Sequence, residues 1–312
     1  MEKWQQCKDL SKFCRTENNK DPNALQQWQQ ERSKFSAECC WSINDPDLKD
    51  YDKEVRLSTH DIYKKYLENG KFSYAEADNN AWTAHYRMLI PLKSKRNVII
   101  KMTFELSTVE KGITNQEIEG IKQLILQIKN IWNGNFALKV TDTSITCCNP
   151  IILPIEFDIQ FAYKGEKIAN GEKNPHKIKL YKIVPQSGAV KRPHLEAGKT
   201  FILETDKDRG FNVLYTYAHE FAHALGIPDH YGYDEKTNSI VQYYQPNGKL
   251  DDTRFVALKN SQGRDKDAPD ADIMNAFNSY KIIKQQGWNI GIAAKKIINN
   301  KRYQCDIIFK GK

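Results

Sequence analysis

The sequence lacks any long uninterrupted apolar segment. A transmembrane helix needs about 20 consecutive apolar residues, and no stretch of the 312 residues approaches that length. Residues 1–7 also lack the apolar core of a cleaved signal peptide. We therefore expect no membrane span. A cytoplasmic location, a mature form from which a signal has been removed, and export without a cleaved signal are all consistent with this, and we favour export without a cleaved signal over a cytoplasmic location.

The basic residues do not form a nucleic-acid-binding pattern. The formal net charge is +8 at pH 7, but the charges are spread along the chain, and short basic runs such as 93–96 are typical of solvated surfaces. Basic and aromatic residues are not interleaved, so we expect no nucleic-acid partner. A hydrophobic content of 40% is typical of a globular protein.

The cysteines have no CxxC spacing, so a second, cysteine-built zinc site is not expected. Two interpretations stay open: disulfides that tie the amino-terminal helices in an oxidising compartment, or reduced and mostly buried thiols. The odd number leaves at least one thiol unpaired. The seven cysteines are Cys7, Cys14, Cys39, Cys40, Cys147, Cys148 and Cys305.

Residues 219–230 read HEFAHALGIPDH and contain two histidines four positions apart. On a helix, His219 and His223 project from one face about one turn apart, so both imidazoles can reach one metal ion. Glu220 lies beside the first histidine, where a carboxylate can act on a metal-activated water. The spacing therefore predicts a zinc site of the kind found in peptidases.

Gly226 is expected to end this helix, because glycine accepts the left-handed backbone that reverses the chain. The reversal would return Asp229 or His230 to the metal as a third ligand. Adjacent side chains in an extended turn point to opposite sides, so both can hardly bind the same ion. Histidine is the commoner metal ligand, which favours His230 on residue type alone.

A bare HExxH also occurs on surface helices that carry two solvated histidines. The neighbouring sequence argues against that interpretation here, because the glycine and two metal-capable side chains follow the motif. An apolar face at helical spacing also precedes and overlaps the motif. Its members are Val213, Leu214, Tyr217, Phe221 and Leu225.

The extended pattern HExxHxxGxPDHY resembles the zinc motif of metzincin-type peptidases. It matches the variant in which aspartate replaces the third histidine, as in snapalysin-like bacterial proteases. The resemblance implies that His219, His223 and Asp229 bind zinc and that Glu220 is the general base. It favours Asp229 over His230, because the third ligand of the family lies ten residues after the first.

Residues 270–277 fit the methionine turn that metzincins carry beneath the zinc, with Met274 as its methionine. An ordinary core methionine is the alternative. In metzincins the substrate lies along an antiparallel edge strand, and residues 176–184 are the candidate here. Tyr231 and Tyr233 are close enough in sequence to be oxyanion donors, although packing tyrosines are the commoner outcome.

Sequence periodicity predicts an α+β fold. Residues 1 to about 70 look helical, and strand-like alternation begins at residue 82. Strands are expected at 82–92, 97–106, 136–140, 155–163, 176–184 and 200–204, with helices at 114–132, at the HExxH motif and within 279–299. Strand, helix, three or four strands and the HExxH helix is the order of a metzincin upper subdomain, so the resemblance covers roughly residues 97–288.

Two regions are therefore predicted. Residues 1–80 form a helical region whose role is open: a pro-segment, a docking or secretion region, or structural padding. Residues 81–312 form a metzincin-like metallopeptidase domain, a twisted mixed sheet with an active-site helix. A switch that places Cys39 or Cys40 on the zinc lacks a flanking switch motif.

Acidic residues in the segment 263–272 are a weak calcium candidate, since they lack a glycine-spaced ligand pattern and are more often solvated. They are Asp265, Asp267, Asp270 and Asp272.

We expect a zinc-dependent endopeptidase with a polypeptide substrate. One alternative is an exported bacterial toxin peptidase that a cognate immunity or inhibitor protein neutralises. The other is a non-catalytic zinc-binding adaptor, although an adaptor has no need of a base at Glu220.

Overall fold

The computed structural model describes residues 39–42, 45–58, 83–144, 148–163, 165–166, 175–184, 193–196, 199–205, 213–227, 231–234, 239–243, 272–274 and 278–311, with isolated positions 26, 30 and 33. Within these ranges, no helix is both long enough and apolar enough to cross a membrane.

Nine strands form one mixed sheet. They are β1 (Asp50–Ser58), β2 (Thr83–Pro91), β3 (Val98–Thr108), β4 (Phe136–Asp142), β5 (Ile151–Tyr163), β6 (His176–Tyr181), β7 (His194–Glu196), β8 (Thr200–Glu204) and β11 (Tyr303–Phe309). The order is β11-β4-β5-β3-β6-β8-β7, and β2 joins β1 to β3. The four central strands β5, β3, β6 and β8 are parallel, whereas β7 runs antiparallel to β8.

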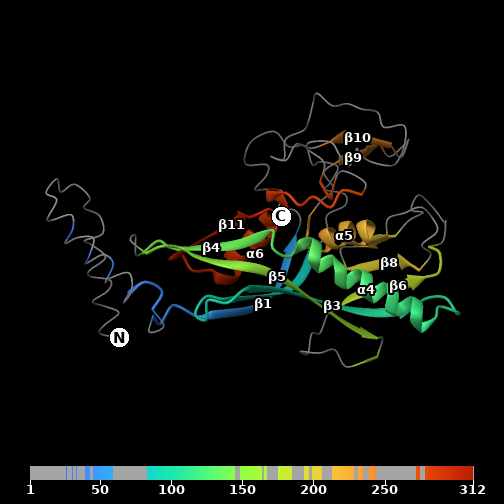
Figure 1. Cartoon of the computed structure of the whole chain (residues 1–312), viewed down its shortest axis with the longest axis horizontal. Coiled ribbons are helices and arrows are strands. Elements are labelled where there is room, and N and C mark those ends of the chain that lie inside the picture. The colour runs from blue at the N-terminus through green and yellow to red at the C-terminus, as the bar shows by residue number, and fades with distance from the viewer. Residues whose placement is uncertain are drawn as a thin grey trace.

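Three α-helices lie in the described part: α4 (Asn115–Trp132), α5 (Val213–Ala224) and α6 (Trp288–Ile298), the last preceded by the 3-10 helix η4 (Lys284–Gly287). A capping box starts α4, because Thr114 and Glu117 each accept a hydrogen bond from the other's main-chain nitrogen. Its apolar stripe is buried, and α4 packs against α5 (Figure 1). Phe221 of α5 lies against Trp132, with ring centroids 6.1 Å apart. A separate hairpin of β9 (Tyr231–Asp234) and β10 (Ser239–Tyr243) follows α5.

The predicted α+β class is confirmed, as are the strands expected from residue 82 onward and the helix at 114–132. The expectation of helix up to about residue 70 is wrong for β1. In β1 the buried residues Tyr51, Val55 and Leu57 are separated by even numbers of positions, so they lie on the same face of the strand, which packs on the core. β1 pairs with β2, so the sheet includes residues on both sides of the boundary predicted at residue 80. The helix expected near residues 59–70 lies outside the described residues.

A disulfide between Cys40 and Cys148 anchors the segment before β1 to the connection between β4 and β5. Cys39 is also disulfide-bonded, and Cys305 is a free, half-buried thiol. Disulfide formation, one of the two interpretations of the cysteines, is therefore confirmed at these positions. The bond between Cys40 and Cys148 ties the amino-terminal segment to the sheet, whereas the prediction had helices tied to one another.

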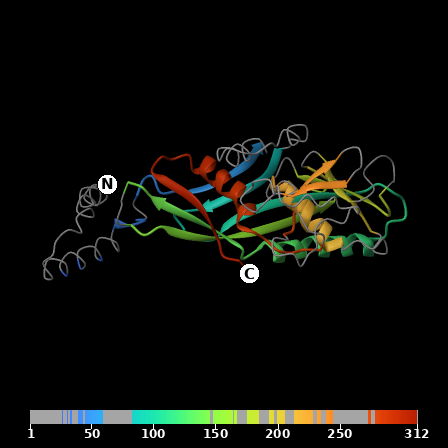
Figure 2. The same cartoon turned by 90° about the horizontal axis from the view of Figure 1, so that it is seen from above.

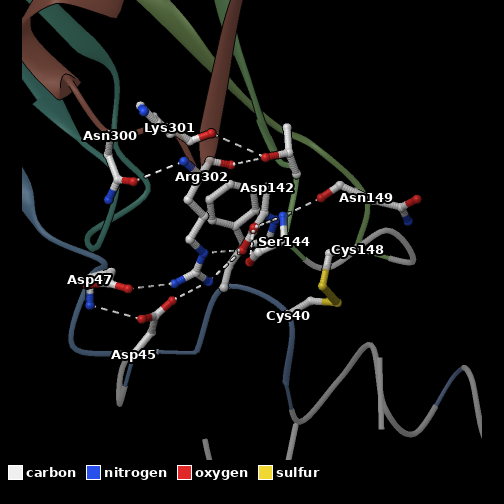
Figure 3. Close-up of polar contacts among 12 residues, drawn as sticks. Cys40, Asp45, Asp47, Asp142, Ser144, Cys148, Asn149, Asn300, Lys301 and Arg302 are labelled. Atoms are coloured by element: carbon white, nitrogen blue, oxygen red, sulfur yellow. Dashed lines mark hydrogen bonds and ion pairs between the residues drawn. A yellow bond between two sulfur atoms is a disulfide. The ribbon is translucent and has the colours of Figure 1, made fainter. Parts of the chain in front are cut away.

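Arg302 reinforces this anchor from the turn before β11 (Figure 3). Its Nη2 atom lies 2.6 Å from Asp45 Oδ2 and 2.5 Å from Asp142 Oδ2, and its Nη1 atom lies 3.4 Å from Asp47 Oδ2. The side chains of Arg302, Asp45 and Asp142 are 9%, 1% and 3% exposed, so each charge depends on its partners rather than on water. Trp41 stacks on Tyr303 beside them. This end of the sheet lies away from α5 along the long axis (Figures 1 and 2).

Replacing Arg302 with methionine should leave two buried carboxylates without their cation. We expect the free energy of unfolding to fall by about 3–5 kcal/mol, measured by urea denaturation. Arg87→Met is the control, because Arg87 pairs with Asp52 on the surface, where an ion pair contributes about 1 kcal/mol or less. Equal losses in the two variants would contradict the anchoring role of Arg302.

A buried histidine pair lies where β2 and β6 meet beside β3. His176 Nε2 lies 2.7 Å from the carbonyl oxygen of His85, and the His176 ring packs against Phe104 and Phe201. Burial lowers the pKa of His176 to about 4, because a charged imidazole is poorly solvated there. His176 is therefore neutral in the folded protein at mildly acidic pH.

This pKa predicts a loss of stability on acidification. The unfolded histidine titrates near 6.5 and the folded one near 4, so between these values the unfolded state binds more protons. The contribution of His176 to the free energy of unfolding is fully present above the pKa of the unfolded state, and it falls as the pH decreases toward the pKa of the folded state. Relative to His176→Gln, the wild type should lose about 2–3 kcal/mol between pH 6.5 and 4.5, measured by urea unfolding at each pH. A difference that stays constant with pH would refute this.

Candidate metal centre and active site

The HExxH motif lies on α5, as its spacing predicts. The helix is buried on most sides, and both His219 and Glu220 are 7% exposed. The rings of His219 and His223 lie side by side, with centroids 4.8 Å apart and planes at 89°. His223 is half-buried, so the interpretation of two solvated histidines on a surface helix is wrong for His219 and for the helix as a whole.

His219 is held by the segment 272–274, which is distant in sequence. Its Nδ1 atom lies 2.8 Å from the carbonyl oxygen of Ile273. The main-chain nitrogen of Met274 donates to Asp272 Oδ1, and the main-chain nitrogen of Ile273 donates to the carbonyl of Lys281. The carbonyl that orients His219 thus belongs to a turn fixed at several points.

His223 is held by the turn that ends its own helix. Gly226 has a φ of 85°, which glycine adopts without steric cost. The main-chain nitrogens of Gly226 and Ile227 donate to the carbonyls of His223 and Ala222, forming a Schellman motif. The turn brings the Ile227 carbonyl to 2.8 Å from His223 Nδ1. Asn289 of α6 donates to the Leu225 carbonyl and secures the helix end.

These two contacts determine the tautomer of each histidine. A carbonyl oxygen can only accept a hydrogen bond, so Nδ1 must carry the proton in both rings. In a neutral imidazole the other nitrogen, Nε2, is then unprotonated, which is the state that a metal ligand needs. His219 and His223 therefore fit a zinc ion chemically, with main-chain carbonyls as their outer partners.

The third ligand is not described by the structure. Both candidates, Asp229 and His230, fall in residues 228–230, outside the described residues. Within the described ranges, no group of three histidine, cysteine, aspartate or glutamate side chains could hold a metal ion. The Gly226 turn brings Ile227, the last residue described before this gap, back to His223.

Glu220 points toward the edge of the sheet. Its Oε2 atom accepts a hydrogen bond of 2.8 Å from the main-chain nitrogen of Leu195 on β7. A carboxylate has two oxygen atoms, so this contact leaves Oε1 able to accept from a water. The Glu220 side chain therefore links the motif helix to β7, an edge strand of the described sheet.

The expectation that residues 176–184 form the edge strand that binds substrate is wrong. Residues 176–184 contain β6, which pairs with β3 on one side and with β8 on the other, so its main-chain groups are used inside the sheet. The edge position on this side of the described sheet belongs to β7, which pairs only with β8 there. The short segment 194–196 gave no clear strand pattern in the sequence, because three residues are too few to show alternation.

The segment around Met274 lies against the motif helix, since Tyr215 and His219 both donate to the Ile273 carbonyl. Met274 itself is fully buried. The ordinary structural role of a core methionine is satisfied by this burial. The methionine turn therefore stays a prediction.

Three other expectations have mixed outcomes. Because Cys39 and Cys40 are disulfide-bonded, neither offers a thiolate to a metal, and the cysteine switch is wrong for this state. Asp272 is 1% exposed and accepts hydrogen bonds from Met274 and Gln286, as a turn residue does. The other acidic residues of the calcium candidate, and the side chains of Tyr231 and Tyr233, lie outside the described part.

The contacts that sequence reasoning missed are mostly main-chain groups: the Ile273 and Ile227 carbonyls and the Leu195 nitrogen. Every residue carries such groups, so no residue type reveals them. Tyr215 was also missed, although it lies one helical turn before His219, and that spacing could have indicated a neighbour on the same face.

No protein-family model matches the chain, and neither the curated proteins nor the solved structures contain a significant match.

Proposed function

We propose that the protein is a zinc-dependent endopeptidase whose metal is held by His219, His223 and Asp229. The observation that carries the proposal is the pair of Nδ1 contacts to main-chain carbonyls, because they leave Nε2 unprotonated, as a metal ligand must be, in two rings whose centroids are 4.8 Å apart. The chain order β3, α4, β4 to β8 and α5 repeats the expected strand, helix, strands and HExxH helix, although five strands rather than three or four separate the two helices.

Bound zinc would supply Lewis acidity, which acidifies a water and polarises the scissile carbonyl. The chain's own contribution to proton transfer is Glu220. Its carboxylate accepts a proton from the attacking water and delivers it to the leaving amine. The hydrogen bond from the Leu195 main-chain nitrogen holds the carboxylate in one orientation, so the side chain need not change rotamer before it accepts the proton.

An extended polypeptide is the substrate that suits this arrangement. β7 is an edge strand of the described sheet and the one that contacts Glu220, and a peptide can add to such an edge through main-chain hydrogen bonds. Its path along β7 would pass Leu195, and therefore Glu220. We infer that β7 takes the role that the sequence suggested for residues 176–184.

The disulfides support a proposal about location. Disulfides persist in oxidising compartments and are rare in reducing cytosol, so the bond between Cys40 and Cys148 favours a protein that works outside the cytoplasm. This supports export. An exported toxin peptidase that an immunity protein neutralises is a more specific form of this proposal. Its chemistry is the same, and the immunity protein is an additional binding partner.

Glu220→Gln tests the chemistry without removing the structural contact. The amide oxygen of glutamine can still accept from Leu195, but an amide cannot take a proton from water. We expect proteolysis of an unfolded protein substrate to fall by about 10²–10⁴-fold, while zinc content stays unchanged.

Glu204→Gln is the matched control. Glu204 is also a buried glutamate, and it accepts a hydrogen bond from the main-chain nitrogen of Val184. It lies on β8, and we assign it no part in the chemistry, so its amide variant should keep activity. A zinc-loaded wild type that cleaves no polypeptide would favour the adaptor instead, and near-normal turnover in Glu220→Gln would rule out Glu220 as the base.

The third ligand is tested by zinc content and activity in two neighbouring variants. Asp229→Ala should lose both metal and activity, because a direct ligand matters more than the outer contacts, whose removal costs roughly 10–100-fold in affinity. His230→Ala should keep its metal. If His230→Ala loses the metal and Asp229→Ala keeps it, the third ligand lies one residue later than in the family, and the snapalysin-like assignment is wrong.

A further inference from the structure

Tyr215 has a contact that neither the motif nor the proposed chemistry uses. Its hydroxyl donates to the Ile273 carbonyl at 3.2 Å, which is the same oxygen that accepts from His219 Nδ1 at 2.8 Å. Two side chains from successive turns of α5 therefore meet on one main-chain oxygen. Tyr215 is 7% exposed, so its hydroxyl is largely removed from water.

The rings of these two residues also pack together. Tyr215 and His219 are four residues apart on one helix face, and their ring centroids are 5.9 Å apart. On its other side Tyr215 meets the half-exposed Tyr280 edge to face at 6.2 Å. A continuous row of rings thus runs from the surface at Tyr280 to His223.

We propose that Tyr215 is a positioning residue for the metal site, acting on His219 through the shared Ile273 carbonyl. This inference rests on the proposed function, since it requires that His219 binds zinc. The hydroxyl limits the directions in which the carbonyl can point. The carbonyl in turn determines the plane of the imidazole and so the direction of its Nε2 electron pair.

The helix supplies a matched comparison two residues away. Tyr217 is 1% exposed, and its hydroxyl also donates to a main-chain carbonyl, that of Glu204, at 2.8 Å. Burial raises the pKa of this hydroxyl, so it remains a protonated donor. The carbonyl of Glu204 belongs to β8 and is not the one that orients His219. The two tyrosines therefore have similar structural roles, and only Tyr215 shares its acceptor with a proposed metal ligand.

The test compares Tyr215→Phe with Tyr217→Phe in the full chain. Zinc dissociation constants are measured by competition with a chromophoric chelator, and the absorption spectrum of the Co²⁺-substituted protein reports the geometry of the ligands. Urea unfolding of the metal-free proteins measures stability separately. Each variant removes one oxygen atom, so the packing of the ring is kept.

Tyr215→Phe should weaken zinc binding by roughly 10-fold, at the lower end of the effect of outer contacts, and should alter the Co²⁺ spectrum. Tyr217→Phe should lower stability without changing either metal readout. p-Aminophenylalanine at position 215 keeps a donor at the same place and should restore the affinity.

The failures of the two proposals are distinguishable. A wild type that binds no zinc would overturn the proposed function and this inference with it. If the wild type binds zinc and Tyr215→Phe changes neither the zinc affinity nor the Co²⁺ spectrum, the inference is overturned and the proposed function is not. Equal weakening by Tyr215→Phe and Tyr217→Phe would also overturn it, because the effect would then follow stability.

Discussion

The proposed site depends on one constraint: both motif histidines donate Nδ1–H to a main-chain carbonyl. His219 uses the carbonyl of Ile273 and His223 that of Ile227. Without these acceptors each ring could rotate or change tautomer, and the two Nε2 atoms would not be presented together. Much of the surrounding structure serves to hold these carbonyls. The Gly226 turn holds one, and the turn at 272–274, supported by Asp272 and Tyr215, holds the other.

The sheet places the other half of the site. Four parallel strands end with an antiparallel edge strand, β7, and the main-chain nitrogen of Leu195 meets the carboxylate of Glu220 there. The proposed base is thus linked to the strand along which a substrate would bind. The Cys40–Cys148 disulfide and the Arg302 cluster (Figure 3) join the segment before β1 to the connection between β4 and β5 and to the turn before β11.

The helices and most strands could be predicted because their patterns are local. The stripe from Ile118 to Trp132 has helical spacing, and its Thr114–Glu117 capping box is visible in the sequence. In the HExxH motif and Gly226, spacing alone predicts which side chains share a helix face and where the helix ends. These signals depend only on residues a few positions apart.

Other features depended on partners that are distant in sequence. Tyr51, Val55 and Leu57 alternate as a strand does, but charged residues between them obscured β1 until its pairing with β2 was known. The pairing of Cys40 with Cys148 spans 108 residues, and seven cysteines permit many pairings. The edge position of β7 is a property of the whole sheet, and the carbonyls that orient the histidines have no signature in residue type.

The central claim is that His219 and His223 present their Nε2 atoms to one zinc ion. Zinc-edge anomalous diffraction from crystals of the purified protein tests it most directly, because it locates the metal independently of activity. The account predicts one zinc per chain, bound by both Nε2 atoms, with the Nδ1 atoms still on the carbonyls of Ile273 and Ile227. A zinc ion at another place, or a zinc-saturated protein with no metal between these two rings, would contradict it.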